Sequence, residues 1–430
     1  MIDELAKILN HKNVEWEIYW EIGTGSSFKI EKYEIVRAQQ KFHSGIGLRI
    51  GYRGRTGFSY ITGVSHRREE LERFVERTIK LARVSEVPFR GFPNSKKKSS
   101  VPGLYDRATA EMSFEEGYDA AAMMIEKGRE ILGEEHTFSG GIAFGTAEDG
   151  VMNSNGIEKT MKSTGISMGV YVLKKNGRRG SGSYYQSFRR LSEAEGEMER
   201  GIEEARRDAE LSWSAGKISQ YEGELVLEPH AVSSVVSILM HSLYGDSVYH
   251  GQSRFQKIGE RISSEILTLV DDSTIEGGAR SYPFDGEGNP GRRSVLIEKG
   301  VLRGFLLDET YGRLMGMEST ANAARDFRTM PHIAASNVIV EGKRENLEEY
   351  EGIVIKKVFG EHTANPISGD FSLTVELGYR IENGELIPFK DNMFVGNIFE
   401  MLNSIAALGR KDEDLSGFIS PRMLIYGKIV

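Results

Sequence analysis

Short runs of alternating apolar and polar residues, separated by glycine-containing turns, limit the folds that are open to this chain. The sequence holds 49 glycines among its 430 residues, whereas the average share in proteins is roughly 7%. Between residues 14 and 62, four such runs follow one another, at 16–20, 29–36, 45–52 and 55–61. Alternation with a period of two, bounded by Gly and Ser, is typical of antiparallel strands. The pattern therefore predicts a β-meander near the N-terminus.

Helices and further strands are predicted in the rest of the first half. An apolar stripe predicts a helix at 67–83, and a proline-containing loop follows at 87–108. Ser113 and Glu116 have the spacing of a capping box, which predicts that a helix starts there. Hairpin turns are predicted at Asn155-Gly156 and Asn176-Gly177. Further strands are predicted at 140–144, 157–163, 166–174 and 180–187, and a charged helix at 192–211. Residues 1–217 are therefore expected to form an α+β domain, an antiparallel sheet with packed helices.

The second half, residues 218–430, is predicted to be mostly β. Strands are expected at 224–227, 266–270, 294–297, 301–307, 336–341, 353–358, 371–381, 386–389 and 422–430. Helices are expected from Pro229 onward and at 310–317, 344–351 and 395–408. A curved or barrel-like sheet is the natural way to bury so many strands.

Composition and charge exclude several classes of function. With 55 Lys and Arg against 63 Asp and Glu, the net charge is −8, so direct binding to nucleic acid is not expected. The absence of cysteine excludes disulfides, thiolate zinc ligands and cysteine nucleophiles. Residues 288–291 lack the Lys-Ser/Thr of a nucleotide-binding loop. No apolar run reaches the roughly 18 residues of a membrane span, and the charged first residues do not form a signal peptide. We therefore expect a cytoplasmic protein without a membrane partner.

The stretch from Glu228 to Asp246 carries a polar stripe on an otherwise apolar helix. With Pro229 in the first turn, four polar residues share one face: His230, Ser234, Ser237 and His241. The two histidines stand roughly 16 Å apart along the axis, too far to bind one zinc ion. A metal site could still form if Asp246 or His250 folded back onto His241. The alternative is a hydrogen-bonded histidine at a helix end.

Polar loops supply the other candidate residues. Asp285 and Glu287 lie in the glycine-rich segment 282–288, and paired carboxylates can perform acid–base chemistry or bind a cation. Asp and Gly also make turns without any further role. Ser319 and Asn322, and later Asp370, lie in polar loops with the same two interpretations.

Several short strings of residues follow one another along nearly the whole chain. They are Gly45-Ile-Gly-Leu-Arg-Ile with Gly57-Phe, His241-Ser-Leu-Tyr-Gly-Asp, Phe284-Asp-Gly-Glu-Gly, Gly300-Val-Leu, Leu314-Met-Gly with Ser319-Thr, Ser368-Gly-Asp-Phe and Ile381-Glu-Asn-Gly. In these strings and their order, the chain resembles the TldD/PmbA family, also described as peptidase family U62 or modulators of DNA gyrase.

The resemblance implies a zinc-binding helix whose motif is incomplete in this chain. The TldD branch resembles a zinc metallopeptidase whose helix carries His-Glu-x-x-x-His. Aligning that motif through Gly245-Asp246 places its second His on His241, its first His on Val236 and its catalytic Glu on Ser237. Val cannot bind zinc, and Ser cannot replace a carboxylate as general base. The late cysteine of the family falls near Ser416. The chain therefore resembles the PmbA (TldE) branch, which lacks the zinc motif.

By this resemblance, the chain is expected to be a subunit that completes a chamber in which a TldD-type partner cleaves unfolded peptides. Zinc would lie in that partner, with no cofactor in this chain alone, and the chain would form a heterodimer with TldD or a homodimer by itself. A β-rich domain could hold the substrate peptide by strand addition. Two alternatives stay open. One is a self-sufficient metallopeptidase that uses His241 with Asp246 or His250. The other is a non-proteolytic regulator that binds DNA gyrase or gyrase-directed toxins.

Overall fold

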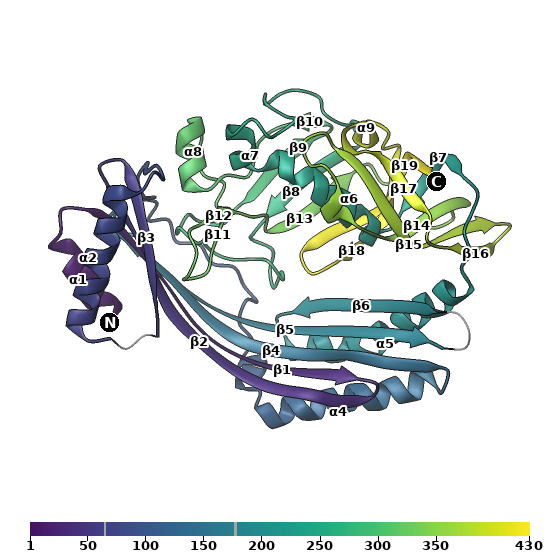
Figure 1. Cartoon of the computed structure of the whole chain (residues 1–430). Helices are drawn as coiled ribbons and strands as arrows, with labels where there is room; N and C mark the ends of the chain where they lie inside the picture. Colours follow the sequence, from purple (N-terminus) through teal and green to yellow (C-terminus); the bar gives the residue numbers. More distant parts are fainter. Residues whose placement is uncertain (64–65, 176–178) are drawn as a thin grey trace.

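The computed structural model describes residues 1–63, 66–175 and 179–430, and within them two β-sheet units lie one above the other (Figure 1). The first is a six-stranded antiparallel sheet in the order β3-β2-β1-β4-β5-β6. Its strands are β1 (Glu15–Glu31), β2 (Glu34–Tyr52), β3 (Arg55–Thr62), β4 (His136–Asn153), β5 (Glu158–Lys174) and β6 (Gly180–Phe188). This sheet confirms the predicted antiparallel N-terminal architecture.

The strands are longer than the alternating runs that predicted them. The run at 29–36 is not one strand, because it contains the turn between β1 and β2, where Lys32 and Tyr33 adopt φ of 49° and 65°. The runs at 157–163 and 166–174 are one continuous strand, β5. The turn at 155–156 joins β4 to β5 as predicted, and the predicted turn at 176–177 lies outside the described residues.

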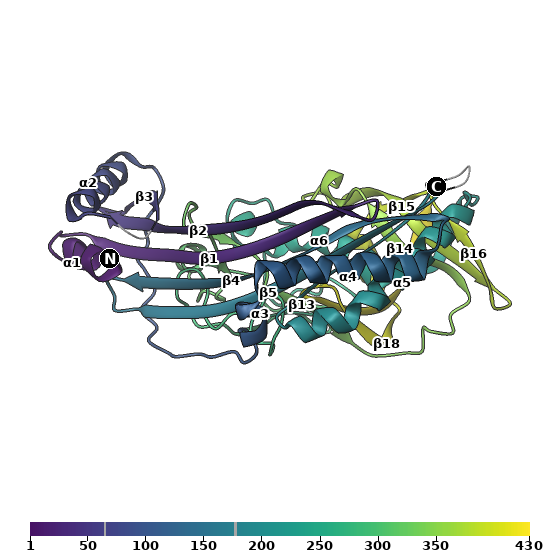
Figure 2. The same ribbon diagram turned by 90° about the horizontal axis from the view of Figure 1, so that it is seen from below.

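Helices cover the face of this sheet that points away from the second unit. They are α1 (Ile2–Asn10), α2 (Arg68–Val84), α3 (Arg107–Glu111), α4 (Phe114–Leu132) and α5 (Leu191–Ser214). The capping box at the start of α4 is confirmed, because the Ser113 side chain accepts from the Glu116 amide at 3.1 Å while the Glu116 carboxylate accepts from the Ser113 amide at 2.7 Å. Seen from below, α4 and α5 lie across the sheet, while α1 and α2 lie at its far end (Figure 2).

Close backbone contact between β3 and α2 depends on one glycine. A Cβ atom at Gly57 would stand 2.5 Å from the backbone of both Thr78 and Ala82 in α2. Backbone atoms of a packed helix cannot move aside cheaply. Glycine at this position therefore allows β3 to lie directly against the helix.

The second unit is an eleven-stranded sheet, part of which closes into a barrel. Five strands, β7-β14-β15-β17-β19, form a ring because β19 pairs with both β17 and β7. This unit confirms the predicted mostly-β, barrel-like architecture. The predicted domain boundary at residue 217 lies in the connection between α5 and β7, and its exact position stays a prediction. The eleven strands are β7 (Tyr221–Leu227), β8 (Leu267–Asp272), β9 (Arg293–Glu298), β10 (Val301–Leu302), β13 (Asn337–Gly342), β14 (Gly352–Phe359), β15 (Asp370–Glu382), β16 (Glu385–Phe389), β17 (Met393–Asn397), β18 (Ala407–Asp414) and β19 (Phe418–Ile429). Two short strands, β11 (Ala323–Ala324) and β12 (His332–Ile333), pair with each other in a separate sheet.

Short helices pack around the barrel, and one of them, α6, contributes to its core. Helix α6 packs against β14 and β19, and its side chains Val232, Val235 and Leu239 are completely buried among those of the barrel strands. The helices are α6 (Pro229–Met240), η1 (His241–Leu243), α7 (Gly245–Tyr249), α8 (Glu309–Met315), η2 (Glu361–Thr363) and α9 (Ile398–Asn403). No helix within the described residues is both long and apolar enough to cross a membrane.

One predicted helix in this unit is wrong, and another is only partly right. The acidic segment 344–351 is not helical, because the Glu345 amide donates to the Leu408 carbonyl at 2.7 Å and Arg344 pairs with Asp412 at 2.8 Å. These contacts, together with a parallel bridge between Arg344 and Leu408, hold the start of the segment extended beside β18. The segment 395–408 is only partly helical. It contains the end of β17, the six-residue α9 and the start of β18, because its first residues pair with β15 and its last with β19.

Candidate functional site

The segment α6–η1–α7 places the residues that the sequence singled out. Val236 is 4% exposed and contributes to the barrel core. Ser237 is exposed, and its hydroxyl donates to the Ser234 carbonyl at 2.7 Å in its own helix. His241 opens the 3-10 turn after α6, and its Nε2 lies 3.4 Å from the Ser247 hydroxyl. Five and four residues before His241, the chain therefore offers an apolar side chain and a hydroxyl that is bonded within its own helix.

Asp246 lies on the next helix, α7, and His250 directly follows it, but neither joins His241 in one cluster. The His250 Nε2 lies 3.3 Å from the hydroxyl of Tyr311 in α8, and the two rings meet edge to face. Asp246 accepts from the Ser247 amide at 2.9 Å. Within residues 1–63, 66–175 and 179–430, no three His, Asp or Glu side chains are grouped so that they could hold a metal ion.

A buried network of charges connects the loops of the second unit to the first sheet. The Arg49 guanidinium on β2 donates to the Glu17 carboxylate at 2.9 and 2.8 Å, and to the Glu287 carboxylate at 2.6 Å. Arg325 donates to Glu17 at 2.5 Å. The Glu309 amide at the start of α8 donates to the other oxygen of Glu287 at 2.8 Å. Glu287 therefore fixes α8 against the sheet, a role that sequence reasoning missed because Arg49 and Glu287 are 238 positions apart.

Asp285 stabilises the turn that carries Glu287. Its carboxylate accepts from the backbone amides of Glu287 at 3.0 Å, Asn289 at 2.9 Å and Ala323 at 3.2 Å. Burial raises the pKa of both carboxyls, and the nearby charge of Glu287 raises the pKa of Asp285 further. The two acids thus bond to different groups, Asp285 to backbone amides and Glu287 to Arg49 and the Glu309 amide.

Ser319 and Asn322 lie beside this turn. The Ser319 hydroxyl donates to the Leu307 carbonyl at 3.1 Å, and the Asn322 side chain donates to the Asp271 carboxylate at 2.9 Å. Asn322 is 1% exposed. Both side chains stabilise the loops between α8 and β12.

Asp370 and Ser416 lie elsewhere. Asp370 begins β15 and accepts from the Asn397 side chain at 2.8 Å. Ser416 is in the turn between β18 and β19, where its hydroxyl accepts from the Ser187 amide of β6 at 2.9 Å. The structure therefore does not gather the predicted loop residues into one site.

A cavity of about 540 Å³ adjoins α7 and α8 and opens between the two units. His250 lies at this cavity, together with Asp308, which precedes α8 and caps it by accepting from the Tyr311 amide at 2.7 Å. Asp308 is 3% exposed. Burial and the neighbouring charge of Glu287 raise the pKa of Asp308 to about 7. No local pattern in the sequence distinguished Asp308 from an ordinary helix cap.

Family-specific sequence patterns match nearly all of the second unit and the N-terminal part of the first. A sequence model of the PmbA/TldA metallopeptidase C-terminal domain matches residues 220–429, and one of the PmbA/TldA metallopeptidase domain 1 matches residues 16–82. Together the two matches cover more than half of the chain. The chain belongs to the TldD/PmbA family.

Relatives from one archaeon match the TldD/PmbA chain nearly end to end. A protein of unassigned function from Methanocaldococcus jannaschii is 28% identical over 100% of this chain and 99% of its own length. A metalloprotease of the same organism is 25% identical over 93% of this chain and 90% of its own. The crystal structure of TldE from Thermococcus kodakarensis has the same fold, with a TM-score of 0.89 at 23% identity over 100% of this chain and 99% of that one.

The family implies a catalytic zinc, and the side chains at the aligned positions of this TldD/PmbA chain do not fit it. Zinc in peptidases is held by imidazole and carboxylate donors, and a carboxylate usually acts as the base. Val236 offers no donor atom, and Ser237 points out of the core with its hydroxyl bonded to Ser234. His241 is the single motif donor that stays.

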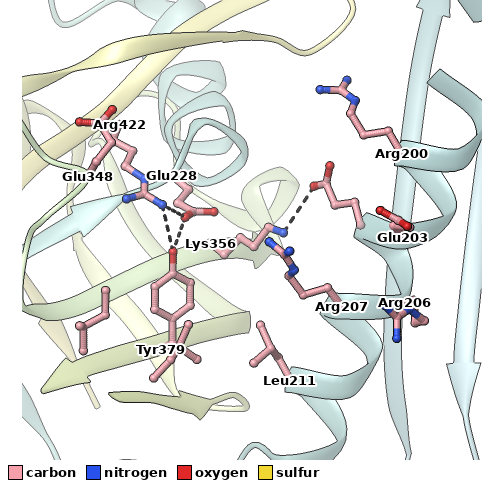
Figure 3. Close-up of a pocket in the computed structure, with 13 residues that line it drawn as sticks. Arg200, Glu203, Arg206, Arg207, Leu211, Glu228, Glu348, Lys356, Tyr379 and Arg422 are labelled. Carbon is pink, nitrogen blue, oxygen red and sulfur yellow. Dashed lines mark hydrogen bonds and ion pairs between the residues drawn. The ribbon is translucent and has the colours of Figure 1, made fainter. Parts of the chain in front are cut away.

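The opposite end of α6 borders a second, highly charged pocket of about 510 Å³ between α5 and the barrel (Figure 3). Glu228, which precedes α6, accepts from Arg422 at 2.6 Å and from the Tyr379 hydroxyl. Lys356 pairs with Asp208 of α5 at 2.5 Å. These paired charges connect α5 to the barrel of the TldD/PmbA chain, and none of the residues predicted for the site lies among them.

Proposed function

We propose that this chain is the PmbA/TldE-like subunit of a TldD-type zinc metallopeptidase, and that it acts on unfolded peptides without holding the catalytic zinc itself. The observation that carries the proposal is the pair Val236 and Ser237, which stand where the family's first zinc ligand and general base would be. His241 alone supplies too few donors for a zinc site, since such sites use three protein ligands and a water molecule.

Two further observations support a paired role. One archaeal genome encodes both a metalloprotease and a second protein, each similar to this chain over at least nine tenths of its length. The overall fold is that of a TldE protein over the whole chain. In this role the chain would bind and orient peptide, while zinc in the TldD-type subunit would polarise the scissile carbonyl and supply the attacking water.

The test is to purify the chain alone, a TldD-type subunit with an intact His-Glu-x-x-x-His motif alone, and the two together. Zinc content is measured by elemental analysis, and cleavage of a disordered peptide is followed by mass spectrometry. We expect zinc to follow the TldD-type subunit, cleavage to require it, and His241→Ala in this chain to leave zinc content unchanged.

Other results would support the alternatives. Stoichiometric zinc in this chain alone, lost in His241→Ala, would overturn the proposal in favour of a self-sufficient metallopeptidase. Specific capture of DNA gyrase or a gyrase-directed toxin, without any cleavage in the presence of the TldD-type subunit, would indicate a regulator instead.

A further inference from the structure

The cavity beside α7 and α8 has the size and the mixed lining of a ligand site. Its volume is about 540 Å³, within the range of roughly 300–1,000 Å³ that is typical of small-molecule pockets. Apolar side chains from both units line it, among them Phe89, Phe92, Leu314 and Met330. Because residues 86–92 follow the first sheet's α2 while α7 and α8 belong to the second unit, the cavity spans the junction of the two units.

Two charged side chains in the wall of this cavity are held in place by hydrogen bonds. Asp308 is 3% exposed; one carboxylate oxygen accepts from the Tyr311 amide at 2.7 Å, and the other receives no hydrogen bond from the described residues. Arg49 is 4% exposed, with Nε and Nη2 bound by Glu17 and Glu287, whereas Nη1 donates to none of the described residues. Both side chains line the cavity, and they lie close enough for the charge of Arg49 to act on Asp308. The cavity wall therefore holds a free acceptor and a free donor near each other.

These two side chains do not satisfy each other. No ion pair within 4.0 Å joins Asp308 to Arg49 in the part of the chain that the structure describes, although the charge of Arg49 lowers the pKa of Asp308. Neither free atom is closed off from solvent, so both can be reached from the cavity. A ligand that offers a donor and an acceptor side by side would complete both.

A peptide unit offers this arrangement, because its N–H and C=O can bond a carboxylate and a guanidinium respectively. A cation would be attracted to Asp308 but repelled by Arg49. An anion would be attracted to Arg49 but repelled by Asp308, so a neutral amide fits the pair best. The apolar walls suit an aromatic or aliphatic side chain.

We propose that this cavity binds one apolar residue of a peptide, with its side chain among Phe89, Phe92 and Leu314 and its main-chain amide bonded to Asp308 and Arg49. The proposal rests on the proposed function, since it makes this chain the subunit that selects the peptide. It names the substrate class as peptides with a large apolar side chain at the bound position.

Equilibrium binding to the full chain alone tests the proposal without any proteolysis. By calorimetry, we expect acetyl-Ala-Phe-Ala amide to bind at least tenfold more tightly than acetyl-Ala-Ala-Ala amide or acetyl-Ala-Lys-Ala amide. Equal affinity for the three peptides would overturn the proposal. The subunit role is tested separately by zinc content and cleavage, so either idea can fail while the other stands.

Variants locate the binding. Asp308→Asn retains a helix-capping side chain but replaces the carboxylate, and should weaken binding of the phenylalanine peptide at least tenfold. The matched control is Asp106→Asn, because Asp106 caps α3 through the Thr109 amide at 2.8 Å and does not line the cavity. The control should change affinity less than twofold, and equal losses in both variants would contradict the site. If Asp308→Asn unfolds, Leu314→Trp, which fills the cavity from its wall, should abolish binding in a folded chain; unchanged binding would refute the site.

Discussion

Replacing Asp149 with asparagine should stabilise the protein at alkaline pH and have little effect in acid. Asp149 on β4 lies directly opposite Glu21 on β1 in the strand register, so two carboxylates are neighbours on one face of the sheet. The Tyr19 hydroxyl donates to Asp149 at 3.3 Å. Burial, and then the charge of Glu21, raise the pKa of Asp149 to about 6. Like charges directly opposite each other destabilise a sheet.

The size and sign of the effect follow from the two protonation states. The difference between a pKa of 3.8 and about 6 corresponds to about 3 kcal/mol. At a pH below the pKa of the unfolded state, the Asp149 carboxyl is neutral in both the folded and the unfolded protein, so it does not lower the free energy of unfolding. As the pH rises toward the folded pKa, the native state holds its proton longer, so the free energy of unfolding falls. Asparagine carries no such penalty and can still accept from Tyr19. The gain should be about 3 kcal/mol at pH 8 and below about 1 kcal/mol at pH 4.

Urea unfolding at the two pH values measures this difference. Trp16 and Trp20 lie on β1 near the substitution, so their fluorescence reports unfolding of the first sheet. Glu148→Gln is the matched control, because this neighbouring carboxylate is 38% exposed and forms a solvent-exposed ion pair with Lys162 at 3.4 Å. The control should change the free energy of unfolding by no more than about 1 kcal/mol at either pH. A variant no more stable than the parent at pH 8, or equally stabilised at pH 4, would refute the reasoning.

Two other substitutions test the packing. Arg49→Met removes the guanidinium that the buried Glu17 and Glu287 share, so that Glu17 keeps only Arg325 and Glu287 keeps only the Glu309 amide. It should cost about 3–5 kcal/mol in urea unfolding. Arg68→Met, at a side chain that is 58% exposed, should cost less than about 1 kcal/mol; equal losses would contradict a buried network. Gly57→Ala places a Cβ 2.5 Å from the backbone of α2 and should cost about 1–3 kcal/mol or more. Gly165→Ala, where a Cβ meets nothing within 4 Å, should be close to neutral by thermal unfolding, and a similar loss at both positions would sink the packing argument.

Local patterns in the sequence were sufficient for most elements. The capping box at Ser113 and the helix that begins at Pro229 depend on contacts within a few residues, and both are present. The alternating runs predicted the antiparallel sheet but not its strand lengths, because Lys32 and Tyr33 make a turn without glycine. Such a turn has no local signature that separates it from a strand.

Contacts between distant segments could not be predicted. The closure of the barrel depends on pairing of β7 with β19, about 200 positions later, and residues 344–351 lose their helical tendency to a contact with β18. The same limit applies to the candidate site. His241 and Asp285 were identifiable as residue types, but Arg49 and Asp308 gain their significance only from burial beside each other. The roles of such residues depend on contacts between distant segments, which cannot be inferred from local patterns in a single sequence.

The central position of β19 also constrains how this chain can be made. β19 pairs with β7, β13, β17 and β18, so the barrel has no closed form until its final strand has been synthesised. During translation at roughly 5–20 residues per second, the first sheet can fold early. The edges of β7 and β17 that pair with β19 stay unpaired until β19 has been synthesised. Unpaired edges attract other chains. We therefore expect the nascent second unit to need protection by a chaperone until β19 has paired.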